Sequence, residues 1–210
     1  MSRPPFIRVT NGMDQDVEIA LVGRLRDGDP DAFDAIHAIF NAQLFTFLLR
    51  LSRRRDVAED LLEEMWLRLV KHAPRLRPDT RLAPWLFTVA RNLHVSYLRS
   101  RVLEDSASAS FMAMWPFSPL ASVACSPFEA TAASELHRRV ERGLASLPAR
   151  SREVLLLVAV GGLTHAEAAD VCGITQEALR QRLSRARAQL VRALDADGVP
   201  RAARLSEVTP

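Results

Sequence analysis

The sequence predicts an all-α protein: two small helical domains joined by a flexible linker, the C-terminal one containing a helix-turn-helix. Apolar residues recur at helical spacing over most of the chain, without strand-like alternation or a fixed-period repeat. Residues 106–133 instead are rich in Ser and Ala, with three prolines and a single charged residue, Glu129, a composition typical of linkers. Two short helical segments near the C-terminus are separated only by a turn at Gly173.

Residues 15–101 are expected to contain four helices. Apolar spacing begins at Gln15 and is broken at Gly28-Asp29-Pro30, where an aspartate can cap the next helix. The pattern then predicts helices over about 33–52, 57–72 and 85–101, and Ala73-Pro74 ends the third of these four helices. A basic, proline-containing loop separates the last two helices.

The second domain begins with helices over 135–146 and 151–160, separated by Pro148. The chain has 210 residues, which is enough for two small domains. The expected division is 1–27 as an N-terminal segment with the start of the first helix, 28–101 as the first helical domain, 102–134 as the linker, 135–194 as the helix-turn-helix domain and 195–210 as a tail.

The helix-turn-helix prediction depends on local capping signals. Thr164 and Glu167 have the spacing of a capping box, Gly173 suits the turn, and Thr175 can cap the second helix. Arginine and glutamine on an exposed recognition helix can bind base edges and phosphates. The apolar stripe is Leu179, Leu183, Ala186 and Leu190, and the residues predicted to read DNA outside it are Gln176, Arg180, Gln181, Ser184, Arg185 and Arg187.

A plain helical hairpin with a solvated arginine face is the alternative to DNA reading. The formal net charge is only +3, and Lys71 is the sole lysine. Arginine suits phosphate and base recognition, but a coding bias toward Arg and Ala accounts equally well for its excess. DNA binding is therefore favoured mainly by three signals that agree with one another: the helix caps, the turn at Gly173, and the separate apolar and polar faces of the second helix. The arginine content adds little.

Other classes of function find little support. We expect no metal, cofactor, small-molecule substrate or enzymatic activity, because Cys125 and Cys172 lack ligand spacing and the histidines occur singly. No signal peptide or long apolar run is evident, so a cytoplasmic protein is expected. The histidines expected at surface or capping positions are His37, His72, His94, His137 and His165.

Two stretches of the first domain indicate which class of DNA-binding protein this chain belongs to. In residues 56–72, acidic residues share an outer surface with apolar ones. Residues 85–101 combine aromatic and basic side chains, which suits single-stranded nucleic acid. The alternative is that Trp85 and Tyr97 are simply core residues, and helical periodicity does not distinguish the two.

The chain resembles the sigma-70 family of RNA polymerase sigma factors, in the extracytoplasmic-function (ECF) group. The stretch "AEDLLEEMWLRL" resembles region 2.2, "PWLFTVARNLHVSYLRSR" resembles region 2.3–2.4, and "LPARSREVLLLVAVGGLTHAEAADVCGITQEALRQRLSRARAQL" resembles region 4. The resemblance covers about 28–101 and 135–194. Three motifs in this order are far more specific than a lone helix-turn-helix.

The resemblance implies a role for each surface. Region 2.2 would dock on the clamp helices of the largest subunit of core RNA polymerase, and region 4 would read the minus-35 element and contact the flap. Region 2.3–2.4 and the loop Arg75–Ala83 would melt and hold the minus-10 element, with Asn92 at the position that contacts a flipped base. The implied residues are Asp60, Glu63, Glu64, Leu67 and Arg68 for polymerase, and Trp85, Arg91, Asn92, Arg99 and Arg101 for the minus-10 element.

The sequence departs from the family pattern at Glu63, where glutamine is common, and at Ser96, where aspartate is common. The partners implied are core RNA polymerase, promoter DNA and an anti-sigma factor, which would at times hold the chain at the inner membrane. A sigma-like decoy that sequesters an anti-sigma factor is the alternative function, and a regulator with a sensor bundle is a third. The aromatic residues of the linker, including Trp115, would pack on a domain or bind a partner.

Overall fold

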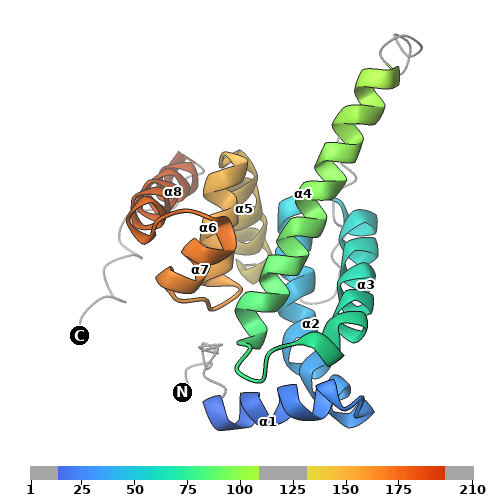
Figure 1. Ribbon diagram of the computed structural model, residues 1–210. Helices are drawn as coiled ribbons and strands as arrows, with labels where there is room; N and C mark the ends of the chain where they lie inside the picture. The colour runs from blue at the N-terminus through green and yellow to red at the C-terminus, as the bar shows by residue number, and fades with distance from the viewer. Residues whose placement is uncertain (1–13, 109–131, 197–210) are drawn as a thin grey trace, which may run out of the picture.

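The computed structural model describes residues 14–108 and 132–196, and within these two ranges every regular element is a helix. The all-α prediction is therefore confirmed. The aromatic part of the linker, residues 109–131, lies outside the described residues. The elements are α1 (Gln15–Arg26), α2 (Pro30–Ser52), α3 (Arg55–His72), the 3-10 helix η1 (Ala73–Arg75), α4 (Leu82–Ser108), α5 (Ala132–Ser146), α6 (Ala149–Ala159), α7 (His165–Cys172) and α8 (Gln176–Ala196) (Figure 1).

The first bundle consists of α2, α3 and α4 packed on one another, with α1 across the end at which α4 begins (Figure 1). Asp29 caps α2 through the N–H of Asp31, and Pro30 occupies the first turn, where it costs no hydrogen bond. Phe47 and Phe87 meet edge to face in the core, with ring centroids 5.1 Å apart. These two buried rings pack α4 against α2 in the core of the bundle.

Helix α2 is long and apolar enough to cross a membrane by length and composition alone. In the structure it is the helix on which α1, α3 and α4 all pack. Its buried side chains include Ile36, Phe40, Leu44 and Phe47. The apolar composition of α2 is therefore that of a core helix.

The second bundle is built around α8, which packs on α5, α6 and α7. Arg152 of α6 is buried, and its guanidinium donates to the carbonyl oxygens of Leu144, Ala145 and Leu147 at 2.8, 3.1 and 3.0 Å. A cation at the carboxyl end of a helix is favourable, and here it satisfies the last carbonyls of α5 and the turn that follows. Burial lowers the pKa of this guanidinium from its usual value.

The two bundles pack against each other, α4 on α7 and α2 on α6, and share one continuous core (Figure 1). Gly161 makes close approach possible: a Cβ at this position would lie 3.1 Å from the Phe87 ring and 2.6 Å from the Leu157 carbonyl oxygen. The sequence predicted two bundles, and the structure adds the interface between them.

Helices α4 and α5 extend beyond their expected ends. Helix α4 continues to Ser108 and α5 begins at Ala132, whereas the sequence pattern predicted a linker over 102–134. The residues after Arg101 contain no glycine or proline before Pro116, so nothing local ends the helix at the expected place.

Candidate nucleic-acid interface

The predicted helix-turn-helix is formed by α7 and α8. Thr164 and Glu167 make the reciprocal capping box, and Gly173 ends α7 in the left-handed conformation with φ of 64°. The Thr175 hydroxyl accepts from the Ala178 N–H at 3.2 Å at the start of α8. These local contacts confirm the capping predictions and fix α8 relative to α7.

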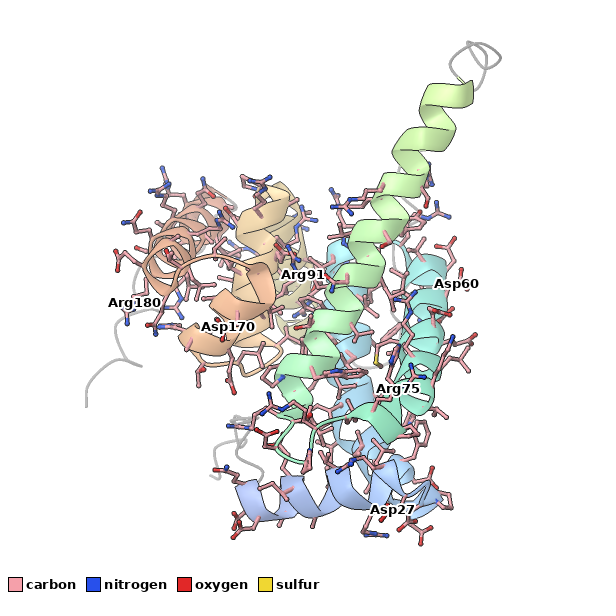
Figure 2. All side chains as sticks on the ribbon, in the orientation of Figure 1. Asp27, Asp60, Arg75, Arg91, Asp170 and Arg180 are labelled. Carbon is pink, nitrogen blue, oxygen red and sulfur yellow. The ribbon has the colours of Figure 1, made fainter. Side chains whose placement is uncertain are left out.

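Helix α8 has one buried and one exposed face. Leu179, Leu183 and Ala186 are at most 2% exposed, and Leu190 is half-buried. Figure 2 shows Arg180 on the outer side of α8. All six residues predicted to read DNA are exposed, namely Gln176, Arg180, Gln181, Ser184, Arg185 and Arg187.

Side chains on the exposed face of α8 make weak contacts with one another. Gln181 lies between Glu177 and Arg185, with N–O distances of 3.2 and 3.4 Å, and Arg180 lies 3.6 Å from Glu177. Ion pairs as exposed as that of Arg180 contribute little to stability. The arginines of α8 can therefore exchange these partners for DNA at small cost.

The predicted minus-10 residues lie along α4 but do not share one face. Trp85, Asn92 and Arg99 follow at intervals of two helical turns and thus line one side of α4, with Asn92 and Arg99 exposed and Trp85 half-buried. By the same helical spacing Arg101 lies on the opposite side, where it contacts the Tyr97 hydroxyl at 3.3 Å. Three of the five residues thus lie on one side of α4, spread over about four helical turns.

Arg91 is occupied by the second bundle. Its Nε donates to a carboxylate oxygen of Glu153 in α6 at 2.8 Å, and both side chains are largely buried, at 23% and 13% exposed. Figure 2 shows Arg91 on the side of α4 that faces the second bundle. Two further ion pairs cross the same boundary, Arg50–Glu141 at 2.8 Å and Arg81–Glu167 at 3.7 Å. Sequence reasoning missed all three pairs.

The expectation that every histidine lies at a surface or cap is wrong for His94, which is 8% exposed. It follows Phe87 and Ala90 on the packed face of α4, so helical spacing carries it inward. Its Nε2 is buried without a hydrogen-bond partner among the described residues. Burial, and secondly the Arg152 charge, lower the pKa of His94 below its usual value of 6.5.

His37 is also not a plain surface residue. Its ring lies 4.8 Å from that of Trp66, which in turn meets Phe33 edge to face at 5.8 Å. The Trp66 indole N–H donates to the Asn41 side-chain oxygen at 3.1 Å. This aromatic cluster fixes α3 on α2.

The predicted polymerase surface forms a single face of α3. Asp60, Glu63, Leu67 and Arg68 are exposed, and Glu64 is half-buried and pairs with Arg68 at 2.8 Å. Leu67 is 66% exposed. Val70, one turn further on, is 56% exposed. Exposed aliphatic side chains among charges suit a protein-binding surface.

The predicted base-pocket loop, Arg75–Ala83, is held at both ends. It begins in η1 and contains an exposed Arg77–Asp79 pair at 3.0 Å. At its other end, the carboxylate of Glu18 in α1 accepts from the Leu82 N–H and from Arg81, each at 2.7 Å. Glu18 was missed, although its spacing to Leu21, Val22 and Leu25 places a carboxylate on the apolar face of α1.

Within the described ranges, no group of three or more His, Cys, Asp or Glu side chains is arranged to hold a metal ion. The thiol of Cys172 at the end of α7 is half-buried, and burial raises its pKa to about 11. A thiol with so high a pKa is not a reactive thiolate at neutral pH.

The fold is that of an all-helical protein in which a helix-turn-helix accompanies a second helical bundle. Family models describe both parts: "Sigma-70 region 2" matches residues 39–104 and "Sigma-70, region 4" matches 137–190. The chain belongs to the ECF group of the sigma-70 family of RNA polymerase sigma factors.

Two curated relatives support this membership. The ECF RNA polymerase sigma factor EcfG of Rhodopseudomonas palustris (strain TIE-1) is 33% identical over 156 residues, covering 74% of this chain and 81% of EcfG. The RNA polymerase sigma factor CarQ of Myxococcus xanthus is 31% identical, covering 77% of this chain and 88% of CarQ.

Solved structures agree on the fold. The sigma factor RpoE in complex with the anti-sigma factor NepR from Bartonella quintana superposes with a TM-score of 0.66 at 25% identity, covering 79% of this chain and 98% of RpoE. CnrH in complex with the cytosolic domain of CnrY superposes with a TM-score of 0.65 at 25% identity, covering 87% of this chain and 100% of CnrH.

Proposed function

We propose that this protein binds core RNA polymerase and directs it to promoters by reading two separate elements. The observation that carries the proposal is the presence on one chain of an exposed helix-turn-helix face on α8 and of Trp85, Asn92 and Arg99 along one side of α4. Sigma factors are initiation factors rather than enzymes, and the partners that follow from family membership are core polymerase and DNA.

Region 4 reads the minus-35 element in this proposal. Helix α8 would enter the major groove, as recognition helices do, with its first turns against the base edges. Arginine binds guanine and glutamine binds adenine in two-point contacts. The reading residues are Gln176, Arg180, Gln181, Ser184, Arg185 and Arg187, and their exposure supports the assignment.

Region 2 melts and holds the minus-10 element. Opening a duplex costs stacking energy of about 1.4 kcal/mol per step, and capture of an extruded base offsets part of that cost. Asn92 would contact the base in a pocket closed by Arg75–Ala83, and Trp85 would stack on a neighbouring base. Arg91 and Arg99 would bind the backbone of the single strand, and Arg101, on the opposite side of α4, would bind it only where the strand passes around the helix.

Region 2.2 is the proposed docking surface for the polymerase clamp helices. Asp60, Glu63, Glu64 and Arg68 would supply charge complementarity, and the exposed Leu67 would supply apolar contact. Region 4 would contact the flap from the second bundle. The functional units in this proposal are residues 28–101 and 135–194, which overlap the two family matches.

Core polymerase would also set the spacing of the two readers. Arg91 is bound to Glu153 while the bundles are packed together, so it is not available to a DNA strand in that arrangement. Holding the bundles apart on polymerase would release Arg91 and raise the effective concentration of each reader at its own element.

An anti-sigma factor is the proposed regulator. RpoE of Bartonella quintana and CnrH were both solved as complexes, with an anti-sigma factor and with the cytosolic domain of CnrY respectively. A membrane-bound anti-sigma factor would hold this otherwise cytoplasmic chain at the inner membrane surface.

The test is run-off transcription with purified core polymerase on genomic fragments, with and without this protein. We expect new transcripts that begin at a fixed distance from a shared two-part motif. Failure to bind core polymerase overturns the proposal. Binding to an anti-sigma factor without binding to core would favour the decoy function instead.

A further inference from the structure

The start of α4 lacks a capping side chain of its own. Arg81 is the residue before the helix, and its carbonyl accepts the first helical hydrogen bond from the Trp85 N–H at 3.2 Å. Arginine has no acceptor atom in its side chain, so it cannot cap. Leu82 is fully buried, and its N–H would be left without a partner at this helix end.

Glu18, separated from Leu82 by 64 residues, supplies the missing cap. One carboxylate oxygen accepts from the Leu82 N–H at 2.7 Å, and the other accepts from the Arg81 Nε at 2.7 Å. Glu18 is only 4% exposed. Both oxygens are therefore committed, and the negative charge lies where the helix dipole and the guanidinium favour it.

This contact lies directly beside the proposed minus-10 site. Leu82 is at the junction between the loop Arg75–Ala83 and α4, one turn before Trp85. The loop makes a second contact with α1 through η1, and Figure 1 shows α1 across this end of the bundle. The orientation of the loop relative to Trp85 and Asn92 thus depends on the Glu18 carboxylate.

We propose that Glu18 is a positioning residue for minus-10 recognition, holding the loop Arg75–Ala83 and the first turn of α4 in the geometry that accepts an extruded base. This rests on the proposed function. Glutamine would keep one acceptor for the Leu82 N–H but would present an N–H₂ group to Arg81, which is itself a donor. Glu18→Gln therefore releases one half of the contact while preserving size.

The experiment compares holoenzymes that contain wild-type protein, Glu18→Gln and the control Asp16→Asn. Asp16 is exposed on the same helix, so the control removes an equivalent charge elsewhere. Fluorescence anisotropy would measure the affinity for core polymerase and, separately, the affinity of holoenzyme for a single-stranded non-template minus-10 oligonucleotide from a promoter mapped by run-off transcription.

We expect Glu18→Gln to weaken oligonucleotide binding roughly tenfold, as loss of a charged hydrogen bond would do, with core affinity within about twofold of wild type. Asp16→Asn should match wild type in both assays. Unchanged oligonucleotide binding by Glu18→Gln, or an equal loss of core affinity, overturns the positioning role.

If Glu18→Gln does not assemble with core, Glu18→Asp replaces it, because it keeps the charge but withdraws the carboxylate by one methylene. A selective loss of oligonucleotide binding then supports the proposal, and failure of both variants to assemble overturns it. Failure of wild-type holoenzyme to bind the oligonucleotide would instead count against the proposed function.

Discussion

The proposed recognition face of α8 and the proposed nucleic-acid face of α4 differ in how the fold presents them. The six α8 residues predicted to read DNA are all exposed, and within the described residues Arg180, Gln181 and Arg185 contact neighbours on the same helix. On α4, Trp85 is half-buried, His94 is buried, and Arg91 is bound to Glu153 of the other bundle. Local caps fix the start of α8, whereas contacts between distant segments fix the start of α4 and the position of Arg91.

The difference indicates that the two readers become available in different ways. In the proposed function, region 4 presents the arginines of α8 on a face that is already exposed. Region 2 would need the loop held by Glu18 and would need Arg91 released from Glu153. We therefore expect upstream recognition to tolerate changes in the contact between bundles, and downstream recognition to respond to them.

The largest effect is expected from Asn92→Ala. Its loss removes the proposed base contact that offsets the few kcal/mol of unstacking, so open-complex formation should fall roughly a hundredfold, while closed-complex binding changes much less. Permanganate reactivity of the melted bases would measure the first and filter binding at low temperature the second. Equal losses in both assays would contradict a role in strand opening.

Arg180→Ala should have the next largest effect. A two-point contact with a base is worth about 1–3 kcal/mol, and its removal should relax specificity at one position of the minus-35 element. Transcription from promoters randomised at that element gives the readout. Arg192, at the far end of α8 with its Nε on the Ala188 carbonyl, offers a matched control in Arg192→Ala. An unchanged base preference in Arg180→Ala would remove Arg180 from the reading face.

Glu153→Gln tests whether the second bundle masks Arg91. Since the ion pair is lost without a change in size, the free protein should bind a minus-10 single strand about threefold more tightly, and holoenzyme should change little. Glu59→Gln removes a carboxylate from the exposed pair with Arg55 and is the control. The masking idea fails if free protein and holoenzyme respond alike.

The smallest effect is a pH dependence of folding stability. The pKa of His94 is lowered in the folded state, so the unfolded state binds more protons as pH falls below about 6.5. Folding has its full stability above that pH and loses part of it below, until the lowered pKa is reached. Thermal unfolding of wild type and His94→Leu between pH 5.5 and 7.5 should diverge only on the acid side, and parallel curves would contradict this.

The helix-turn-helix could be predicted from sequence because its signals are local. Thr164, Glu167 and Gly173 act within one or two turns of where they stand, and the leucine stripe of α8 has helical spacing. The fold class and the family followed from the same kind of pattern. The assigned roles of individual site residues remain predictions.

The ion pairs and caps that could not be predicted join residues far apart in the chain. Arg91 and Glu153 are separated by 62 residues, and Glu18 and Leu82 by 64. Helical periodicity says which side of α4 is buried, but not that a second bundle covers it. The Arg152 charge that acts on His94 likewise comes from α6, in the other bundle.

The distance between the bundles tests the central claim most directly. Dyes on Glu59→Cys and Ala188→Cys, both exposed positions, would report this distance by energy transfer once Cys125 and Cys172 are replaced by alanine. The account predicts high transfer in the free protein and low transfer in holoenzyme, with release of Arg91. Equal transfer in both states would show that the bundles stay packed on polymerase, and would contradict it.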